Sequence, residues 1–176
     1  SDVIGIYKQV IQDLKEKRMV LFSGTPCQVA ALKNYLKISM VDTENLITCD
    51  FICHGVPSPL MWKEYLKFIE KRYNDKIISI NFRDKELGWH KPCLKIEMKN
   101  HSQKLTEEQD PFYQLFYSNC ILRKSCHTCE YSRTTRVSDI TMGDCWGIEE
   151  TKPFLDDNKG LSLIMINSEK GENILT

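Results

Sequence analysis

The sequence predicts an α/β fold with a mostly parallel sheet, flanking helices and a cysteine-rich loop region. Helical and strand-like patterns alternate over residues 1–75, which is typical of parallel strands joined by crossover helices. Short apolar runs at 139–142 and 161–166 predict further strands. The segment 119–137 is polar and contains a Cys-x-x-Cys pair, so we expect a loop there.

The first elements follow from apolar spacing. Residues 3–14 have helical periodicity, with Asp2 as the expected N-cap. The run 19–22 predicts a strand that enters a tight turn, and a second helix follows it. Residues 46–52 predict a buried strand. A third helix is marked by Trp62, Tyr65, Leu66 and Ile69.

The middle of the chain has a different pattern. Residues 76–82 and 94–98 predict two strands, 100–110 a polar loop and 111–117 a short aromatic helix. A length of 176 residues suits a single domain, 1–176. The chain begins in a helical pattern without a start Met, so we expect a piece of a longer protein.

The composition excludes several classes of function. Hydrophobic residues make up 41% and charged residues 27%, as in an ordinary soluble globular protein. The 24 basic residues balance the 24 acidic ones, so no net charge attracts nucleic acid. No apolar stretch reaches the roughly 18 residues that span a bilayer, and no secretory signal opens the chain. We expect a cytoplasmic protein.

Eight cysteines are a high number for this length. Disulfides are typical of small secreted chains, but this chain is large enough to have its own core and shows no export signal. Cys126 and Cys129 form a Cys-x-x-Cys pair beside basic residues. Soft thiolates of this kind bind zinc, copper(I) or iron–sulfur clusters. One pair supplies only half of a four-ligand site, so further ligands must come from elsewhere.

Two other cysteines follow predicted strands. Cys27 stands where a strand turns into a helix, and a helix N-terminus favours a thiolate; a half-buried cysteine after a turn is an equal alternative. Cys53 ends the next strand. Because the carboxyl ends of parallel strands share one edge, we expect both at that edge. Cys49 and Cys93 are expected in the core.

A glycine-rich turn follows the predicted strand at 139–142. Gly143 and Gly147 flank Asp144 and Trp146, which suggests close backbone approach beside a stacking ring. A tight turn with a core Trp is the favoured alternative from the sequence alone. Gly24-Thr25 before a helix is too short to identify a nucleotide site.

Several motifs occur in a fixed order along residues 20–167. They are Phe22-Ser-Gly-Thr-Pro-Cys-Gln28, Cys53-His-Gly-Val-Pro-Ser58, Phe82-Arg-Asp-Lys85 with Gly88-Trp89, Ser125-Cys-x-x-Cys-x-Tyr131 and Ser138-Asp-Ile-Thr-Met-Gly-Asp-Cys-Trp-Gly147. Together they resemble the C-terminal domain of the coenzyme F-420 hydrogenase/dehydrogenase beta-subunit family. The His-Gly-Val-Pro-Ser and Gly-Trp forms resemble a bacterial branch found with polysaccharide-biosynthesis genes.

The resemblance implies an iron–sulfur flavoprotein oxidoreductase. Such a domain relays electrons between a 4Fe–4S cluster, FAD and an organic or deazaflavin substrate, with a ferredoxin-like domain or protein as electron partner. An N-terminal ferredoxin-like part is implied to be absent here, and the isolated fragment is expected to be inactive. The implied cluster ligands are Cys27, Cys53, Cys126 and Cys129. The implied flavin contacts are Gly24, Thr25, Gln28, Gly143, Asp144 and Trp146.

The alternative is a structural zinc-binding interaction domain without redox chemistry. The same four thiolates can hold zinc tetrahedrally, so zinc can also stand in place of the cluster. The Gly-Thr-Pro-Cys and Gly-Asp-x-Trp-Gly motifs favour the redox interpretation.

Overall fold

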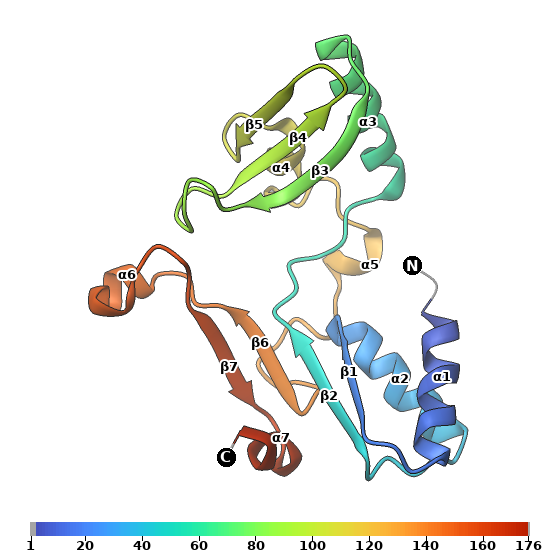
Figure 1. The fold of residues 1–176 in the computed structure, drawn as a ribbon. Coiled ribbons are helices and arrows are strands. Elements are labelled where there is room, and N and C mark those ends of the chain that lie inside the picture. Colours follow the sequence, from blue (N-terminus) through green and yellow to red (C-terminus); the bar gives the residue numbers. More distant parts are fainter. Residues whose placement is uncertain (1–2, 176) are drawn as a thin grey trace. The chain divides into compact units, whose positions relative to one another are not determined.

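A computed structural model describes residues 3–175, which fold into two compact units (Figure 1). The first unit comprises Ser1–His54, Glu130–Gly147 and Leu161–Thr176. The second comprises Gly55–Cys129 and Ile148–Gly160. Each unit has a sheet of its own, so residues 3–175 contain two sheets where one was expected.

The first unit contains a four-stranded sheet in the order β1-β2-β6-β7. The strands β1 (Val20–Gly24), β2 (Leu46–Phe51) and β6 (Ile140–Asp144) are parallel, and β7 (Ser162–Ile166) is antiparallel to β6. This arrangement confirms the α/β class and the mostly parallel sheet. The predicted strands at 139–142 and 161–166 are β6 and β7.

Two helices form the core of the first unit with β1 and β2. These are α1 (Ile4–Lys15) and α2 (Pro26–Ile38), which correspond to the first two predicted helices; α1 ends one residue beyond the predicted pattern of 3–14. Asp2, the expected N-cap, lies outside the described residues, and α1 is preceded by Val3. The core consists of Tyr7, Val10, Leu14, Phe22, Val29, Leu32, Leu36 and Leu46. A third helix, α7 (Glu169–Leu175), follows β7.

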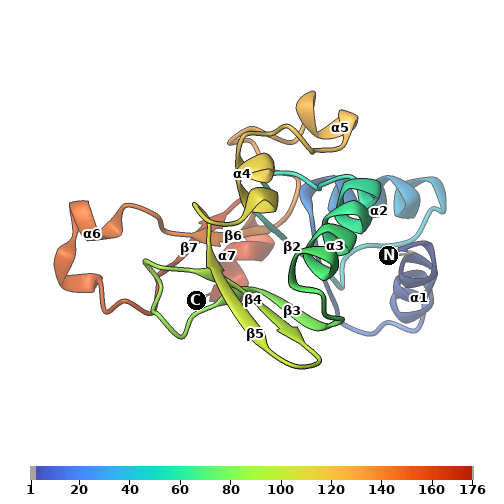
Figure 2. The same ribbon diagram turned by 90° about the horizontal axis from the view of Figure 1, so that it is seen from above.

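The second unit has an antiparallel sheet, β3 (Ile77–Asp84), β4 (Cys93–Met98) and β5 (Ser102–Thr106). Figure 2 shows α3 (Pro59–Tyr73) and α4 (Pro111–Tyr117) beside it, and both contribute to one core with β4. The loop predicted at 100–110 was wrong, because β5 occupies its centre. Only Leu105 is apolar in β5, so the strand has no hydrophobic alternation to reveal it.

Short elements complete the second unit. A helix of four residues, α5 (Lys124–His127), lies inside the segment 119–137 that was expected to be a loop. The segment after β6 contains α6 (Ile148–Thr151) and the 3-10 helix η1 (Pro153–Leu155). Helices this short leave no periodicity in the sequence. Among the helices of residues 3–175, none has the length and apolar character required to cross a bilayer.

Candidate functional site

Cys27 lies in the first turn of α2, directly after β1. Gln28 fixes this turn by accepting a hydrogen bond from the Thr25 backbone N–H at 2.9 Å, as in a capping box. The Thr25 hydroxyl lies 3.1 Å from the Cys27 sulfur. The Cys27 side chain is exposed. The turn therefore presents a thiol at a helix N-terminus, where negative charge is favoured.

Tyr7 supports the turn from α1. Its hydroxyl donates a hydrogen bond to the Gln28 backbone carbonyl at 2.8 Å. Burial raises the pKa of Tyr7, and negative charge on Cys27 raises it further. The phenol therefore stays a neutral donor and keeps the first turn of α2 tied to α1.

Cys53 follows the neighbouring parallel strand. The register pairs Gly24 of β1 with Asp50 of β2. Cys27 comes three residues after Gly24, and Cys53 comes three residues after Asp50. The expectation that these two strands run parallel as neighbours, so that their carboxyl ends share an edge, is confirmed.

The Cys-x-x-Cys pair begins on α5 of the second unit. Cys126 donates its backbone N–H to the Arg123 carbonyl at 2.8 Å, which closes the turn. Cys126 is half-buried and Cys129 is exposed.

The strand-like segment after Cys53 pairs with the segment before this turn. Ser58 donates its N–H to the Ile121 carbonyl at 2.8 Å, and Arg123 donates to the Val56 carbonyl at 2.9 Å. A Cβ on Gly55 would lie 3.5 Å from the Cβ of Cys126. The second unit therefore holds the residues after Cys53 against Cys126.

Arg136 makes the matching connection in the first unit. Its guanidinium donates to the carbonyls of Tyr131 and Phe51, each at 3.3 Å. It also forms a buried ion pair with Asp50 at 3.1 Å. Phe51 precedes Cys53 by two residues, and Tyr131 follows Cys129 by two. The first unit therefore fastens the segment before Cys53 to the segment after Cys129.

The remaining cysteines differ in their surroundings. Cys49 is 9% exposed and Cys93 is 1% exposed, so both core predictions are confirmed. Burial, followed by the charge of Asp50, raises the pKa of the Cys49 thiol. None of the eight cysteines is in a disulfide. Within the described residues, no three His, Cys, Asp or Glu side chains are arranged to hold a metal ion.

The residues expected to contact a flavin all lie in the first unit. A Cβ on Gly24 would lie 3.0 Å from Gln28 Oε1, and one on Gly143 would lie 2.7 Å from Ile52 Cδ1. Both glycines therefore allow close packing by neighbours in the same chain. Trp146 is 59% exposed, so the alternative of a core Trp is wrong and its ring is accessible for stacking.

Arg136 and Asp50 were missed by the sequence interpretation. Asp50 is fully buried within β2, and its Oδ1 accepts hydrogen bonds from Arg136 at 3.1 Å and Thr141 at 2.5 Å. A charged residue inside an otherwise uncharged strand is the only signal in the sequence, and Arg136 is 86 residues away from it. Only the fold pairs them.

The order of the motifs and the strand arrangement can be compared with known proteins. The family model that describes the C terminus of the beta subunit of coenzyme F420 hydrogenase/dehydrogenase matches residues 17–176. The chain belongs to this family. The chain is also 24% identical over 168 residues to the F420-dependent formate dehydrogenase subunit beta of Methanocaldococcus jannaschii. That alignment covers 96% of this chain and 38% of the relative's length.

Proposed function

We propose that this member of the coenzyme F420 hydrogenase/dehydrogenase beta-subunit family is an oxidoreductase domain that holds a 4Fe–4S cluster and binds FAD. The observation that carries the proposal is that hydrogen bonds hold the chain in place both before and after Cys53. Arg136 ties the preceding residues to the segment after Cys129, and Gly55 and Val56 pair with the turn at Arg123–Cys126. The residues on either side of Cys53 are therefore each held by hydrogen bonds within their own unit.

The donor set suits the proposed cluster. None of Cys27, Cys53, Cys126 and Cys129 is in a disulfide, and each is exposed or half-buried. Iron–sulfur clusters are held by four cysteine thiolates. The helix N-terminus at Cys27 favours the negative charge that a thiolate carries. The buried Cys49 and Cys93 are unsuited to this role.

The flavin contacts are proposed on the turns that follow β1 and β6. Trp146 offers an exposed ring for stacking, and Thr25 lies beside Cys27 at the start of α2. The relevant chemistry is exchange of hydride by the flavin and of single electrons by the cluster. The chain's own contribution is to orient these groups and to hold the cysteine-bearing segments in place.

The substrate and partners are proposed from the relative. Its name indicates dependence on F420, which favours a deazaflavin or another small organic substrate for this chain. We propose a ferredoxin-like domain or protein as the electron partner.

Anaerobic reconstitution with iron and sulfide tests the cluster. The protein should turn brown and bind about four irons per chain, as a four-thiolate cluster requires. Cys126→Ser should lose the iron, because serine is a poor ligand for such clusters. Cys120→Ser is the matched control, since Cys120 is exposed in the same unit and is not a proposed ligand. Equal iron loss in both variants would contradict the ligand assignment.

A structural zinc domain is the second candidate, favoured by the same four cysteines, none of which is in a disulfide. Colourless protein that contains about one zinc per chain after anaerobic preparation would support zinc and contradict the redox proposal.

A further inference from the structure

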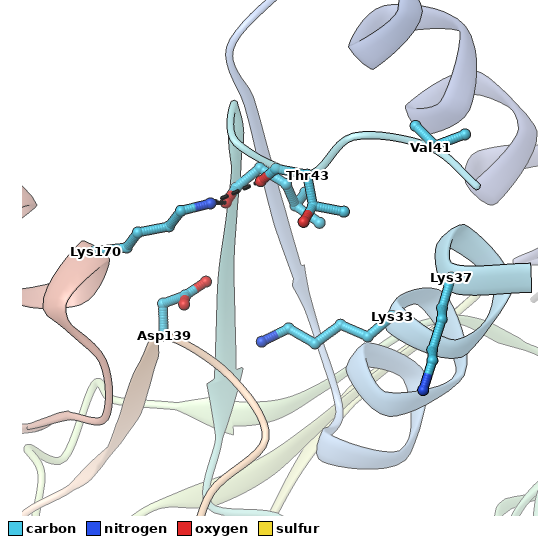
Figure 3. Close-up of a pocket in the computed structure, with 7 residues that line it drawn as sticks. Lys33, Lys37, Val41, Thr43, Asp139 and Lys170 are labelled. Carbon is cyan, nitrogen blue, oxygen red and sulfur yellow. Dashed lines mark hydrogen bonds between the residues drawn. The ribbon is translucent and has the colours of Figure 1, made fainter. Parts of the chain in front are cut away.

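A basic cavity of about 390 Å³ lies at the opposite edge of the first unit's sheet, where β2 and β6 begin (Figure 3). Leu46 is the first residue of β2, and Asp139 directly precedes β6. Lysines from α2 and α7 surround this edge. The lining residues are Lys33, Lys37, Val41, Thr43, Leu46, Asp139 and Lys170.

Two of the lysines are held in place by backbone carbonyls. Lys33 Nζ donates to the Val137 carbonyl at 2.6 Å. Lys170 Nζ donates to the carbonyls of Thr43 at 2.6 Å and Leu46 at 3.2 Å. A lysine ammonium has three N–H donors, so both keep donors for a ligand. Because these side chains are already ordered, a ligand would not have to offset their full rotamer entropy.

Among the residues that the structure describes, none of the three lysines of the cavity forms an ion pair. Asp139 accepts hydrogen bonds from the Thr48 N–H at 2.8 Å, the Thr48 hydroxyl at 2.6 Å and the Ser168 hydroxyl at 2.7 Å. Its two oxygens are thus engaged by neutral donors. Asp42, near Lys170, instead pairs with Lys17 at 3.3 Å. The lining therefore contains three lysines and one carboxylate.

Lys37 supplies the third cation of the cavity. It lies one helical turn after Lys33, in the last turn of α2, where the helix dipole favours a cation. The dipole explains a lysine at this position but not the convergence of Lys33 and Lys170 on the same cavity. The side chain of Lys37 has no hydrogen bond or ion pair to any described residue, so all its donors are available.

We propose that this cavity binds a phosphate group. Several ammonium donors around one space suit a tetrahedral dianion, which accepts many hydrogen bonds at once. The volume lies within the range of about 300–1,000 Å³ that is typical of small-molecule sites. The phosphate can therefore be free or carried by a small molecule such as a nucleotide. This site is separate from the proposed cluster and does not depend on it.

Titration calorimetry on the metal-free full chain tests the proposal, with inorganic phosphate, AMP and adenosine as probes in low-salt buffer. Inorganic phosphate should bind saturably and more weakly as salt is added. Lys37→Gln and Lys33→Gln should each weaken phosphate binding about tenfold, since each removes a charge-assisted hydrogen bond. Lys8→Gln, an exposed lysine on α1 in the same unit, should leave the affinity unchanged.

The variants separate binding from folding. Lys33→Gln also loses the hydrogen bond to Val137, whereas Lys37→Gln removes no hydrogen bond or ion pair among the described residues, so a loss of affinity in Lys37→Gln reports binding alone. AMP binding at least tenfold tighter than phosphate, with no binding of adenosine, would support a nucleotide as the source. Equal affinities for AMP and phosphate would support free phosphate as the ligand of the cavity. The proposal would be overturned if neither inorganic phosphate nor AMP bound saturably, or if Lys8→Gln lost as much phosphate affinity as the other variants.

Discussion

Gly55 occupies a backbone conformation that other residues rarely adopt. Its φ is +150°, and a Cβ there would lie 2.9 Å from Leu122 Cδ1 and 3.5 Å from the Cβ of Cys126. The absence of a side chain lets the segment after Cys53 pass close to the Cys-x-x-Cys turn.

Gly55→Ala should therefore lower the free energy of unfolding by about 1–2 kcal/mol, because the added Cβ meets Leu122 and the backbone is strained. Urea denaturation measures this change. Gly5→Ala is the control: its Cβ would meet nothing within 4 Å in α1, and alanine favours a helix. A loss of stability in Gly5→Ala as large as in Gly55→Ala would contradict the explanation.

The buried carboxylate of Asp139 makes stability depend on pH. Burial by itself would raise the pKa of Asp139, but hydrogen bonds from Thr48 and Ser168, aided by the charge of Lys33, hold it below the usual 3.8. A carboxyl group with a lowered pKa stabilises the folded state above its unfolded pKa, and this stabilisation is lost as pH falls through the folded pKa.

Asp139→Asn should lower the free energy of unfolding at neutral pH by about 2 kcal/mol, because a charged acceptor of several hydrogen bonds is lost. The difference from the wild type should narrow below pH 3.8. Urea denaturation of both proteins between pH 7 and pH 3 measures this difference in the free energy of unfolding. A difference that stays constant over this range would contradict the assigned cause.

At the scale of elements, Arg136 connects β2 to the cysteine-rich segment. The Arg136 side chain is 8% exposed and that of Asp50 is fully buried. Among the described residues, Asp50 Oδ2 has no hydrogen-bond partner, so the charge of Asp50 is balanced through Oδ1. A guanidinium can reach Asp50, Phe51, Tyr131 and Thr141 together, whereas an ammonium has fewer donors and no planar fork.

Arg136→Lys should lower the free energy of unfolding of the metal-free protein by about 2 kcal/mol, because several hydrogen bonds to a charged group are lost. It should also speed amide hydrogen exchange over residues 131–136. The control is Arg133→Lys on the same segment, whose side chain is exposed. Unchanged exchange in Arg136→Lys would show that the segment is held by other contacts.

Helices and strands with a regular apolar spacing could be predicted from the sequence. Long helices such as α1 and α3 and the strand β2 were predicted because their apolar residues recur at a clear spacing. The strand β5 was missed because its polar residues pair with β4 across an edge, through backbone hydrogen bonds that any side chain allows.

At the scale of the whole molecule, the two units are built from interleaved segments. The chain passes from one unit to the other after His54, Cys129, Gly147 and Gly160. The first unit consists of three separate stretches and the second of two. A unit assembled from distant stretches depends on the chain between them, so its folding is coupled to that of the other unit.

We therefore expect a single domain in solution, with one cooperative unfolding transition in scanning calorimetry. The calorimetric and van't Hoff enthalpies should agree, as for a two-state domain. Two separate transitions, or a calorimetric enthalpy well above the van't Hoff value, would show that the units unfold independently.

By itself, the sequence determined the α/β class, the alternating elements of the first half and the thiols able to bind a soft metal, because periodicity and residue chemistry are local properties. Only the tertiary structure decided the division into two sheets, the pairing of Arg136 with Asp50, the packing of Gly55 beside Cys126 and the convergence of Lys33 and Lys170 on one cavity. Each of these joins residues far apart in the chain, and their proximity depends on how whole elements pack.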